Sequence, residues 1–179
     1  RDRTDRCPGV FTTHAAADGA LARIRLPGGS ITAPQLEALA EGTAEYGDGF
    51  LEITARGNLQ IRGIGDTDAL GALIVDAGLA PTSTHDRARN IEVSSLTGRI
   101  GGAADLRPVV AELDDLLRAD EVFARLSGRF LFGLDDGRGD VLARHPDVTA
   151  VARTGSVADV LLGELTLGSV PVDALASEM

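Results

Sequence analysis

Two short strand-like runs that carry arginines constrain the fold of this chain more than any other feature. The first run spans residues 20–26 and the second spans residues 58–64, and each is bounded by glycine. Side chains two positions apart on a strand point to the same face. We therefore expect Arg23 and Arg25 to project together, with the apolar residues of the first run on the opposite face.

A row of guanidiniums is a poor sheet core but a good surface for anions. Arginine stays charged and offers a planar fork of donors that matches a carboxylate. The alternative is an ordinary solvated sheet face, and the residue pattern alone leaves both open. All 17 basic residues are arginine, yet the net charge is −10. Such an acidic balance argues against general affinity for nucleic acid or attachment to anionic membranes.

Helical segments separate and follow these strands. Thr32 lies three residues before Gln35, with a proline between them, and this spacing predicts a capping box at a helix start. That helix is expected to end at Gly47, and a second is expected over residues 66–78. With a further strand over residues 50–54, the order becomes β-α-β-β-α. This order predicts an α+β fold that begins with a ferredoxin-like split βαβ half-domain.

A cluster of Pro, Thr, Ser and Asp at residues 81–86 predicts a domain boundary. We expect one domain over residues 1–82 and a second, small α+β domain over residues 83–179, which is incomplete. The second domain is expected to contain a strand within 87–93, a helix over 105–118, a hairpin of 129–135 with 141–153, a helix that begins at Ser156, and an amphipathic tail over 170–179.

Other chemistry is sparse. Cys7 is the only cysteine, which excludes an internal disulfide framework and any all-protein iron–sulfur site within one chain, and it fits the cytoplasm. The three histidines, His14, His85 and His145, have no metal-ligand spacing, so no metal site is predicted. No apolar run has the length of a membrane span. The pair Asp135-Asp136 indicates turn chemistry, and no catalytic residue can be assigned.

Five short motifs, in this order, resemble the nitrite/sulfite reductase family. They are Leu26-Pro-Gly-Gly29, Thr54-Ala-Arg56, Asn58-Leu-Gln60, Arg62-Gly63 and Arg89-Asn-Ile91. The form Asn-Leu-Gln-Ile-Arg-Gly, together with Asp5-Arg-Cys-Pro-Gly9 ahead of Asp18-Gly19, is most similar to the precorrin-3B synthase branch of that family. The resemblance covers nearly the whole chain, densely to about residue 96 and loosely afterwards.

The resemblance implies a molecule of two ferredoxin-like halves and two α+β halves around a polycarboxylate tetrapyrrole. This chain would be the tetrapyrrole-binding half of a precorrin-3B synthase-like oxidoreductase of aerobic cobalamin biosynthesis. The alternatives are a fragment of a siroheme-dependent sulfite or nitrite reductase, and a non-catalytic half-length module that binds a tetrapyrrole or a partner.

The resemblance also implies cofactors and partners. A complete family member would hold a 4Fe-4S cluster and siroheme or mononuclear iron, whereas this chain alone would hold none. The implied partner is the missing second half or another copy of the chain.

The same motifs imply roles for individual residues. Arg56 corresponds to an arginine that contacts the tetrapyrrole, and Arg89 to one that faces the reactive side of the ring. Arg129-Phe130-Leu131 resembles a Lys-x-Lys strand that binds the anionic substrate of sulfite reductases. Leu131 in place of the second lysine counts against sulfite or nitrite reduction. The predicted tetrapyrrole-binding residues are Arg23, Arg25, Arg56, Asn58, Gln60, Arg62, Arg89, Asn90 and Arg129.

Overall fold

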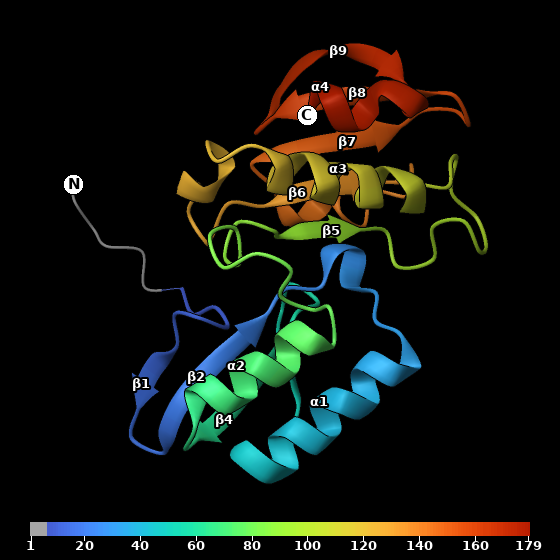
Figure 1. The fold of residues 1–179 in the computed structure, drawn as a ribbon. Coiled ribbons are helices and arrows are strands. Elements are labelled where there is room, and N and C mark those ends of the chain that lie inside the picture. Colours follow the sequence, from blue (N-terminus) through green and yellow to red (C-terminus); the bar gives the residue numbers. More distant parts are fainter. Residues whose placement is uncertain (1–6) are drawn as a thin grey trace. The chain divides into compact units, whose positions relative to one another are not determined.

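The computed structural model describes residues 7–179 and contains two sheets with helices packed on them (Figure 1). The predicted α+β class is confirmed. The chain divides into two compact units. Unit 1 comprises the described residues up to Leu26, Ser30–Arg89 and Glu121–Arg129, and unit 2 comprises Pro27–Gly29, Asn90–Asp120 and Phe130–Met179. The domain boundary between residues 82 and 83 stays a prediction.

Unit 1 contains a four-stranded antiparallel sheet in the order β1-β2-β4-β3. Its elements are β1 (His14–Ala16), β2 (Gly19–Ile24), α1 (Ala33–Tyr46), β3 (Glu52–Ile53), β4 (Leu59–Ile64), α2 (Thr67–Asp76) and a 3₁₀ turn, η2 (Phe123–Arg125). The two arginine-bearing strands are neighbours, and Ala22 pairs with Ile61. The predicted β-α-β-β-α order is confirmed, with β1 added inside the predicted lead-in. The first six residues of that lead-in lie outside the described residues.

Both helices of unit 1 pack onto this sheet through one apolar core. Leu39 of α1 and Ile74 of α2 belong to the same buried cluster as Ile24 of β2 and Ile61 of β4. Burial of such side chains contributes roughly 1.5–3 kcal/mol each. The start of α1 is fixed by local chemistry and confirms the predicted capping box. The Thr32 N–H donates to Gln35 Oε1 at 3.1 Å, and the Gln35 N–H donates to Thr32 Oγ1 at 3.4 Å.

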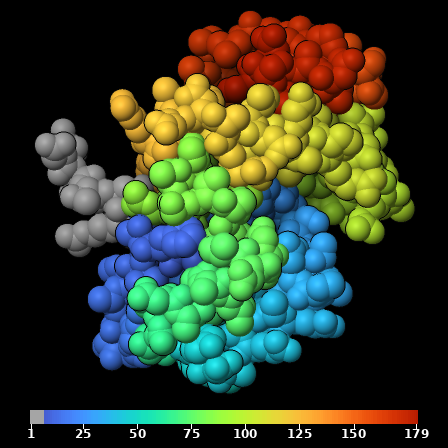
Figure 2. Space-filling model, viewed as in Figure 1, coloured from blue at the N-terminus to red at the C-terminus, as the bar shows by residue number. Residues whose placement is uncertain are grey.

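Unit 2 contains a five-stranded mixed sheet in the order β5-β6-β7-β8-β9. Its elements are η1 (Pro27–Gly29), β5 (Ile91–Val93), α3 (Arg107–Ala119), β6 (Phe132–Asp135), η3 (Leu142–Arg144), β7 (Val148–Ala152), β8 (Val157–Leu162), β9 (Leu165–Pro171), η4 (Val172–Ala174) and α4 (Leu175–Glu178). The exposed edge strand β9 and α4 form an outer surface of this unit, in red in Figure 2. No helix among residues 7–179 is long and apolar enough to cross a membrane.

Two expectations for unit 2 are wrong. The predicted hairpin after β6 does not form, because β6 and β7 run parallel and are joined by a loop that holds η3. Every residue of β6 and β7 is buried, as expected for parallel strands covered on both faces. The predicted helix at Ser156 is instead strand β8. A short apolar run fits either element, and pairing with β7 and β9 decides for the strand.

Candidate anion-binding site

Arg25 is the most unusual of the predicted site residues, because its charged side chain is only 2% exposed. Nη2 lies 3.5 Å from the carbonyl oxygen of Gly128, at the limit of a hydrogen bond. Nε and Nη1 have no hydrogen-bond partner among the described residues. Burial, and next the charge of Arg23, lower the pKa of Arg25 to about 10. The guanidinium therefore stays protonated at neutral pH, buried and mostly unpaired.

The expected exposed row of guanidiniums is therefore wrong for Arg25. Strand β2 ends at Ile24, so Arg25 lies directly after the strand. The backbone of Gly128, from the Glu121–Arg129 segment of the same unit, lies against its side chain.

Arg23 is half-buried and held by an amide from the neighbouring strand. Its Nη2 donates to Gln60 Oε1 at 2.9 Å, and Gln60 Nε2 donates to Glu52 Oε2 at 2.7 Å. The strand register places these side chains opposite one another, because Gln60 pairs with both Arg23 and Glu52. Nε of Arg23 is buried without a partner among the described residues. Gln60 thus orients Arg23 and leaves one of its donors open.

Arg56 reaches the segment that also contacts Arg25. It lies in the turn between β3 and β4, beside Gly57, whose φ of 68° requires glycine-like freedom. Its Nη1 donates to the carbonyl oxygen of Arg129 at 2.7 Å. The charges of Arg23 and Arg56 both act on Arg25. We call Arg23, Arg25 and Arg56 the arginine cluster.

The negative charge of Asp86 acts on the cluster, because it raises the pKa of Arg25. Its Oδ2 accepts the N–H of Val10 at 2.6 Å and that of Phe11 at 3.3 Å. Burial raises the pKa of Asp86, while these two hydrogen bonds and the charges of Arg25 and Arg89 oppose the rise. Asp86 is thus committed to backbone amides, and it forms no ion pair with Arg25 among the described residues.

The two asparagines of the predicted site contact protein backbone. Asn58 is buried, and its Oδ1 accepts the N–H of Leu26 at 2.9 Å, directly after Arg25. Asn90 belongs to unit 2, where its Nδ2 donates to the carbonyl oxygen of Phe130 at 3.2 Å. These contacts identify both residues as supports of the local backbone. Their role toward a ligand stays a prediction, as does that of every other predicted site residue.

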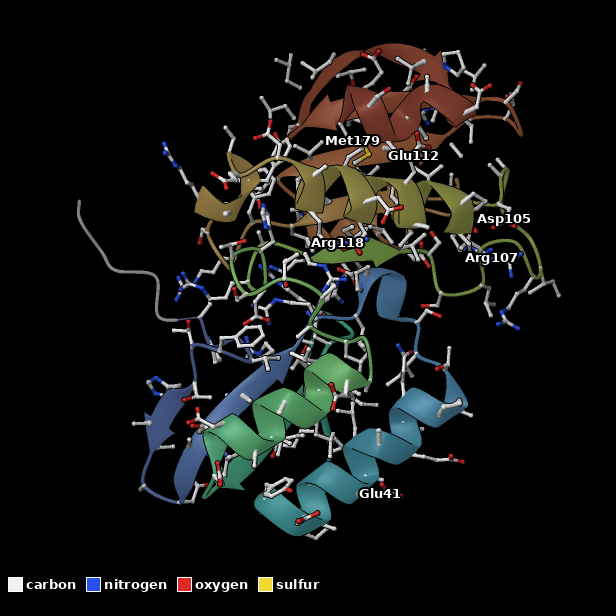
Figure 3. All side chains as sticks on the ribbon, in the orientation of Figure 1. Glu41, Asp105, Arg107, Glu112, Arg118 and Met179 are labelled. Carbon is white, nitrogen blue, oxygen red and sulfur yellow. The ribbon has the colours of Figure 1, made fainter. Side chains whose placement is uncertain are left out.

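Many of the other arginines are neutralised by acids, as Figure 3 illustrates for Arg107 and Asp105. The pairs are Arg62–Asp18, Arg107–Asp105, Arg118–Asp114, Arg138–Asp136, Arg144–Glu92 and Arg153–Asp159. Arg62 is thus held by Asp18 at 3.2 Å. By contrast, neither the arginine cluster nor Arg129 forms an ion pair with any described carboxylate. The arginine cluster and Arg129 thus differ from the ion-paired arginines in lacking a carboxylate partner among the described residues. The spacing of arginines along the sequence does not reveal this difference.

An acidic group in unit 2 is explained by its own loop. Asp135, Asp136 and Asp140 could bring three carboxylate oxygens within 4.8 Å of one another. However, Asp135 accepts four backbone N–H groups of the following loop. Asp136 pairs with Arg138, and Asp140 accepts the hydroxyl of Ser94. The predicted turn chemistry at Asp135-Asp136 is confirmed.

The fold of unit 1 matches a known family. Residues 14–73 match the nitrite/sulfite reductase ferredoxin-like half domain, a span that runs from β1 into α2. The chain belongs to the nitrite/sulfite reductase family, and the resemblance read from its motifs is confirmed.

Individual relatives refine this placement. The chain is 35% identical to a precorrin-3B synthase of Sinorhizobium sp over 138 residues, which are 75% of this chain and 29% of the relative. It is 31% identical to a ferredoxin–nitrite reductase of Synechococcus elongatus over 164 residues, 87% of this chain and 32% of the relative. These similarities fit a precorrin-3B synthase-like member of the family.

A solved structure supports the fold. The NirA protein of Mycobacterium tuberculosis superposes with a TM-score of 0.70 at 21% identity, covering 88% of this chain and 32% of that one. The predicted fold class is thus confirmed. The chain spans about a third of the length of these relatives.

Proposed function

We propose that the arginine cluster, with Arg89 and Arg129, binds the carboxylates of a polycarboxylate tetrapyrrole. One observation carries the proposal: two donor nitrogens of the buried Arg25 guanidinium, Nε and Nη1, have no hydrogen-bond partner among the described residues. A buried charge without a partner costs several kcal/mol. A ligand carboxylate that accepts these donors would remove that cost through charge-assisted hydrogen bonds.

Similarity to a precorrin-3B synthase supports a more specific proposal. We propose that the chain is the tetrapyrrole-binding part of a precorrin-3B synthase-like oxidoreductase of aerobic cobalamin biosynthesis. Leu131 favours this over nitrite or sulfite reduction. It is a buried apolar residue whose N–H donates to Asp147 Oδ2 at 2.8 Å, so this position offers no cation to a small anion. The similarity to ferredoxin–nitrite reductases supports the siroheme alternative.

An iron–sulfur cluster does not fit the residues of this chain. A 4Fe-4S cluster takes four cysteine thiolates, and Cys7 is the only cysteine. We assign no step of the reaction to such a cluster here.

We further propose that unit 1 pairs with a second half-domain, supplied by another copy or another polypeptide. Strand β3 is an open edge of the sheet and only two residues long. Phe50 and Ile53, beside and within this edge, are 71% and 80% exposed. An open edge beside exposed apolar side chains favours association. The family's description as a half domain supports the same conclusion.

The carboxylate proposal is tested by titrating the absorbance of uroporphyrin with the full chain. Replacing Arg56 with Ala should raise the Kd about tenfold or more, since a charged hydrogen bond contributes roughly 1.5–3 kcal/mol. Arg56→Lys should recover part of the loss, because lysine keeps the charge without the fork. The matched control is Arg107→Ala, which removes an exposed, ion-paired arginine of unit 2.

Two further comparisons make the titration specific. Added salt should weaken binding of uroporphyrin, which is an octacarboxylate. A dicarboxylate porphyrin of the protoporphyrin class should bind far more weakly, since it offers fewer anions to the cluster. Equal affinities for wild type, Arg56→Ala and Arg107→Ala would overturn the proposal.

A further inference from the structure

A cavity of about 740 Å³ lies within unit 2, where the loop between β6 and β7 covers part of the sheet. Thr149 of β7 and Leu161 of β8 both line it, and they are paired neighbours that share one face of the sheet. Gly133 of β6 pairs with Thr149, and a Cβ added to Gly133 would lie 2.4 Å from Pro146 Cγ. The loop therefore packs on the face that carries Thr149, and the cavity has the size of a small-molecule site.

The hydroxyl of Thr149 points to a polar ligand atom. Thr149 is fully buried, and its Oγ1 has no hydrogen-bond partner among the described residues. Burying a hydroxyl without a partner is unfavourable, and buried polar side chains are rarely left unpaired. Because Thr149 is fully buried, a ligand atom reaches Oγ1 only when a lining side chain shifts. Leu142 and Leu162 line the same cavity and are 36% and 53% exposed, so they have room to move.

The charge of the cavity lining favours a cation. Asp147 and Glu164 are exposed carboxylates that line it. None of the lining residues, which all belong to the described part of the chain, is an arginine or a lysine. The nearby Arg144 is ion-paired with Glu92 at 2.6 Å. A protonated amine would therefore meet two acidic groups at the entrance, and charged hydrogen bonds to carboxylates are the strong ones.

Hydrogen bonds to the rest of unit 2 fix Asp147 in position. Its Oδ2 accepts the N–H of Leu131 at 2.8 Å, and its own N–H donates to the carbonyl oxygen of Leu131 at 2.9 Å. Its carbonyl oxygen accepts the N–H of Gly163 at 2.9 Å, which ties the loop to the turn between β8 and β9. One carboxylate of the entrance is thus placed before any ligand arrives.

We propose that this cavity binds small aryl-alkyl amines. The ammonium binds at the entrance, where Asp147 and Glu164 supply carboxylates. The aromatic ring packs against the apolar lining, which includes Phe130 and Leu161. A polar N–H or O–H of the ring pairs with Thr149 Oγ1. The inference does not depend on the tetrapyrrole proposal, because no residue of the arginine cluster lines the cavity.

The test uses tryptamine as the probe, with the full chain. The chain has no tryptophan, so fluorescence anisotropy excited at the indole band reports the ligand alone. Tryptophol has the same ring with a hydroxyl in place of the amine. It should bind about fivefold more weakly or worse, because it offers no charge to the two carboxylates. Equal affinities of the wild type for tryptamine and tryptophol, or no saturable binding of tryptamine, would overturn the proposal without reference to any variant.

Two variants with matched controls locate the site. Glu164→Gln should raise the Kd for tryptamine about twofold to fivefold and leave that for tryptophol unchanged, since it removes only an exposed charge. Glu112→Gln, an exposed acid on α3, is its control.

Thr149→Val keeps the shape of the side chain and should raise the Kd for tryptamine about threefold or more. Thr166→Val, at an exposed threonine of β9, should not. Because the hydroxyl of Thr149 has no partner in the fold, its removal should leave the urea midpoint unchanged or raised. A folded Thr149→Val with full affinity for tryptamine would also overturn the proposal.

Discussion

Asn58 Oδ1 accepts the backbone N–H of Leu26 at 2.9 Å, and both residues are buried. Asn58 directly precedes β4, and Leu26 directly follows Arg25. This bond fixes the backbone at the point where the buried guanidinium begins. Asn58 is therefore a positioning residue for Arg25.

Replacing Asn58 with Ala should destabilise unit 1 by about 1–3 kcal/mol, because the buried N–H of Leu26 loses its acceptor. It should also weaken porphyrin binding, since Arg25 loses its fixed backbone. Asn58→Asp keeps an acceptor oxygen and should restore affinity more than stability. Urea unfolding and the absorbance titration measure the two effects. Full porphyrin affinity in Asn58→Ala would contradict the positioning role.

Gly9 leaves no room for a side chain beside Asp86. An added Cβ would lie 2.0 Å from Asp86 Oδ2, so Gly9→Ala must displace the carboxylate from the N–H groups of Val10 and Phe11. We expect a loss of about 1–3 kcal/mol in urea unfolding. Gly71→Ala is the contrasting change, because nothing lies within 4 Å of its Cβ and it sits inside α2. It should stabilise by about 0.5–1 kcal/mol.

Asp135 should make unit 2 sensitive to acid. Burial raises the pKa of this carboxyl, but its four backbone hydrogen bonds outweigh burial and hold the pKa below its usual value. The folded pKa is below the unfolded one, so the stabilisation is present above about pH 4 and is lost as pH falls through the folded pKa. Asp135→Asn should cost about 2–4 kcal/mol near neutral pH and flatten the acid dependence.

Asp86 should give the opposite dependence of stability on pH from Asp135. Its pKa is raised, chiefly by burial. Its contribution is fully present below the unfolded pKa and is lost as pH rises through the folded pKa. Asp86→Asn should therefore remove the loss of stability that the wild type shows as pH rises above about 4, the usual pKa of an aspartate. Urea midpoints measured from acidic to neutral pH separate the two residues, and parallel curves for both variants would contradict both assignments.

The open edge at β3 predicts self-association of the chain. Sedimentation at micromolar concentration should show species larger than the monomer, and Ile53→Lys should shift them toward the monomer. Ile100→Lys is a control, since Ile100 is also exposed but lies in a loop of unit 2. A clean monomer of the wild type in the absence of any other polypeptide would contradict pairing with a second copy.

Local chemistry explains why unit 1 could be predicted from the sequence. The box of Thr32 and Gln35 and the cap at Asp66 mark helix starts within a few residues. The arginines at alternate positions near β2 and the alternating residues of β4 favour strands, and the pairing of the two strands is a finding of the structure. In unit 2, the strand β8 could not be told from a helix, because its assignment depends on pairing with two other strands. A single apolar run in the sequence does not indicate which distant strands it will pair with.

The candidate site was predictable only as a set of residue types. The strand-like run of residues 20–26 pointed to Arg25 and a family motif pointed to Arg56, but the backbone contact of the buried Arg25 comes from Gly128, 103 residues away. The ion pair that occupies Arg62 comes from Asp18, 44 residues away. Which arginines stay open is thus decided by contacts between distant segments, and spacing along the chain carries no signal for them.

The Glu121–Arg129 segment limits where recombination with related genes can preserve unit 1. It belongs to unit 1 although it follows α3 of unit 2, and it supplies the carbonyl oxygens that contact Arg25 and Arg56. A recombination breakpoint after Arg89 would pass on the arginines without these acceptors. Gene shuffling between relatives should therefore tolerate exchanges that carry residues 121–129 along with the first unit, and select against those that leave them behind.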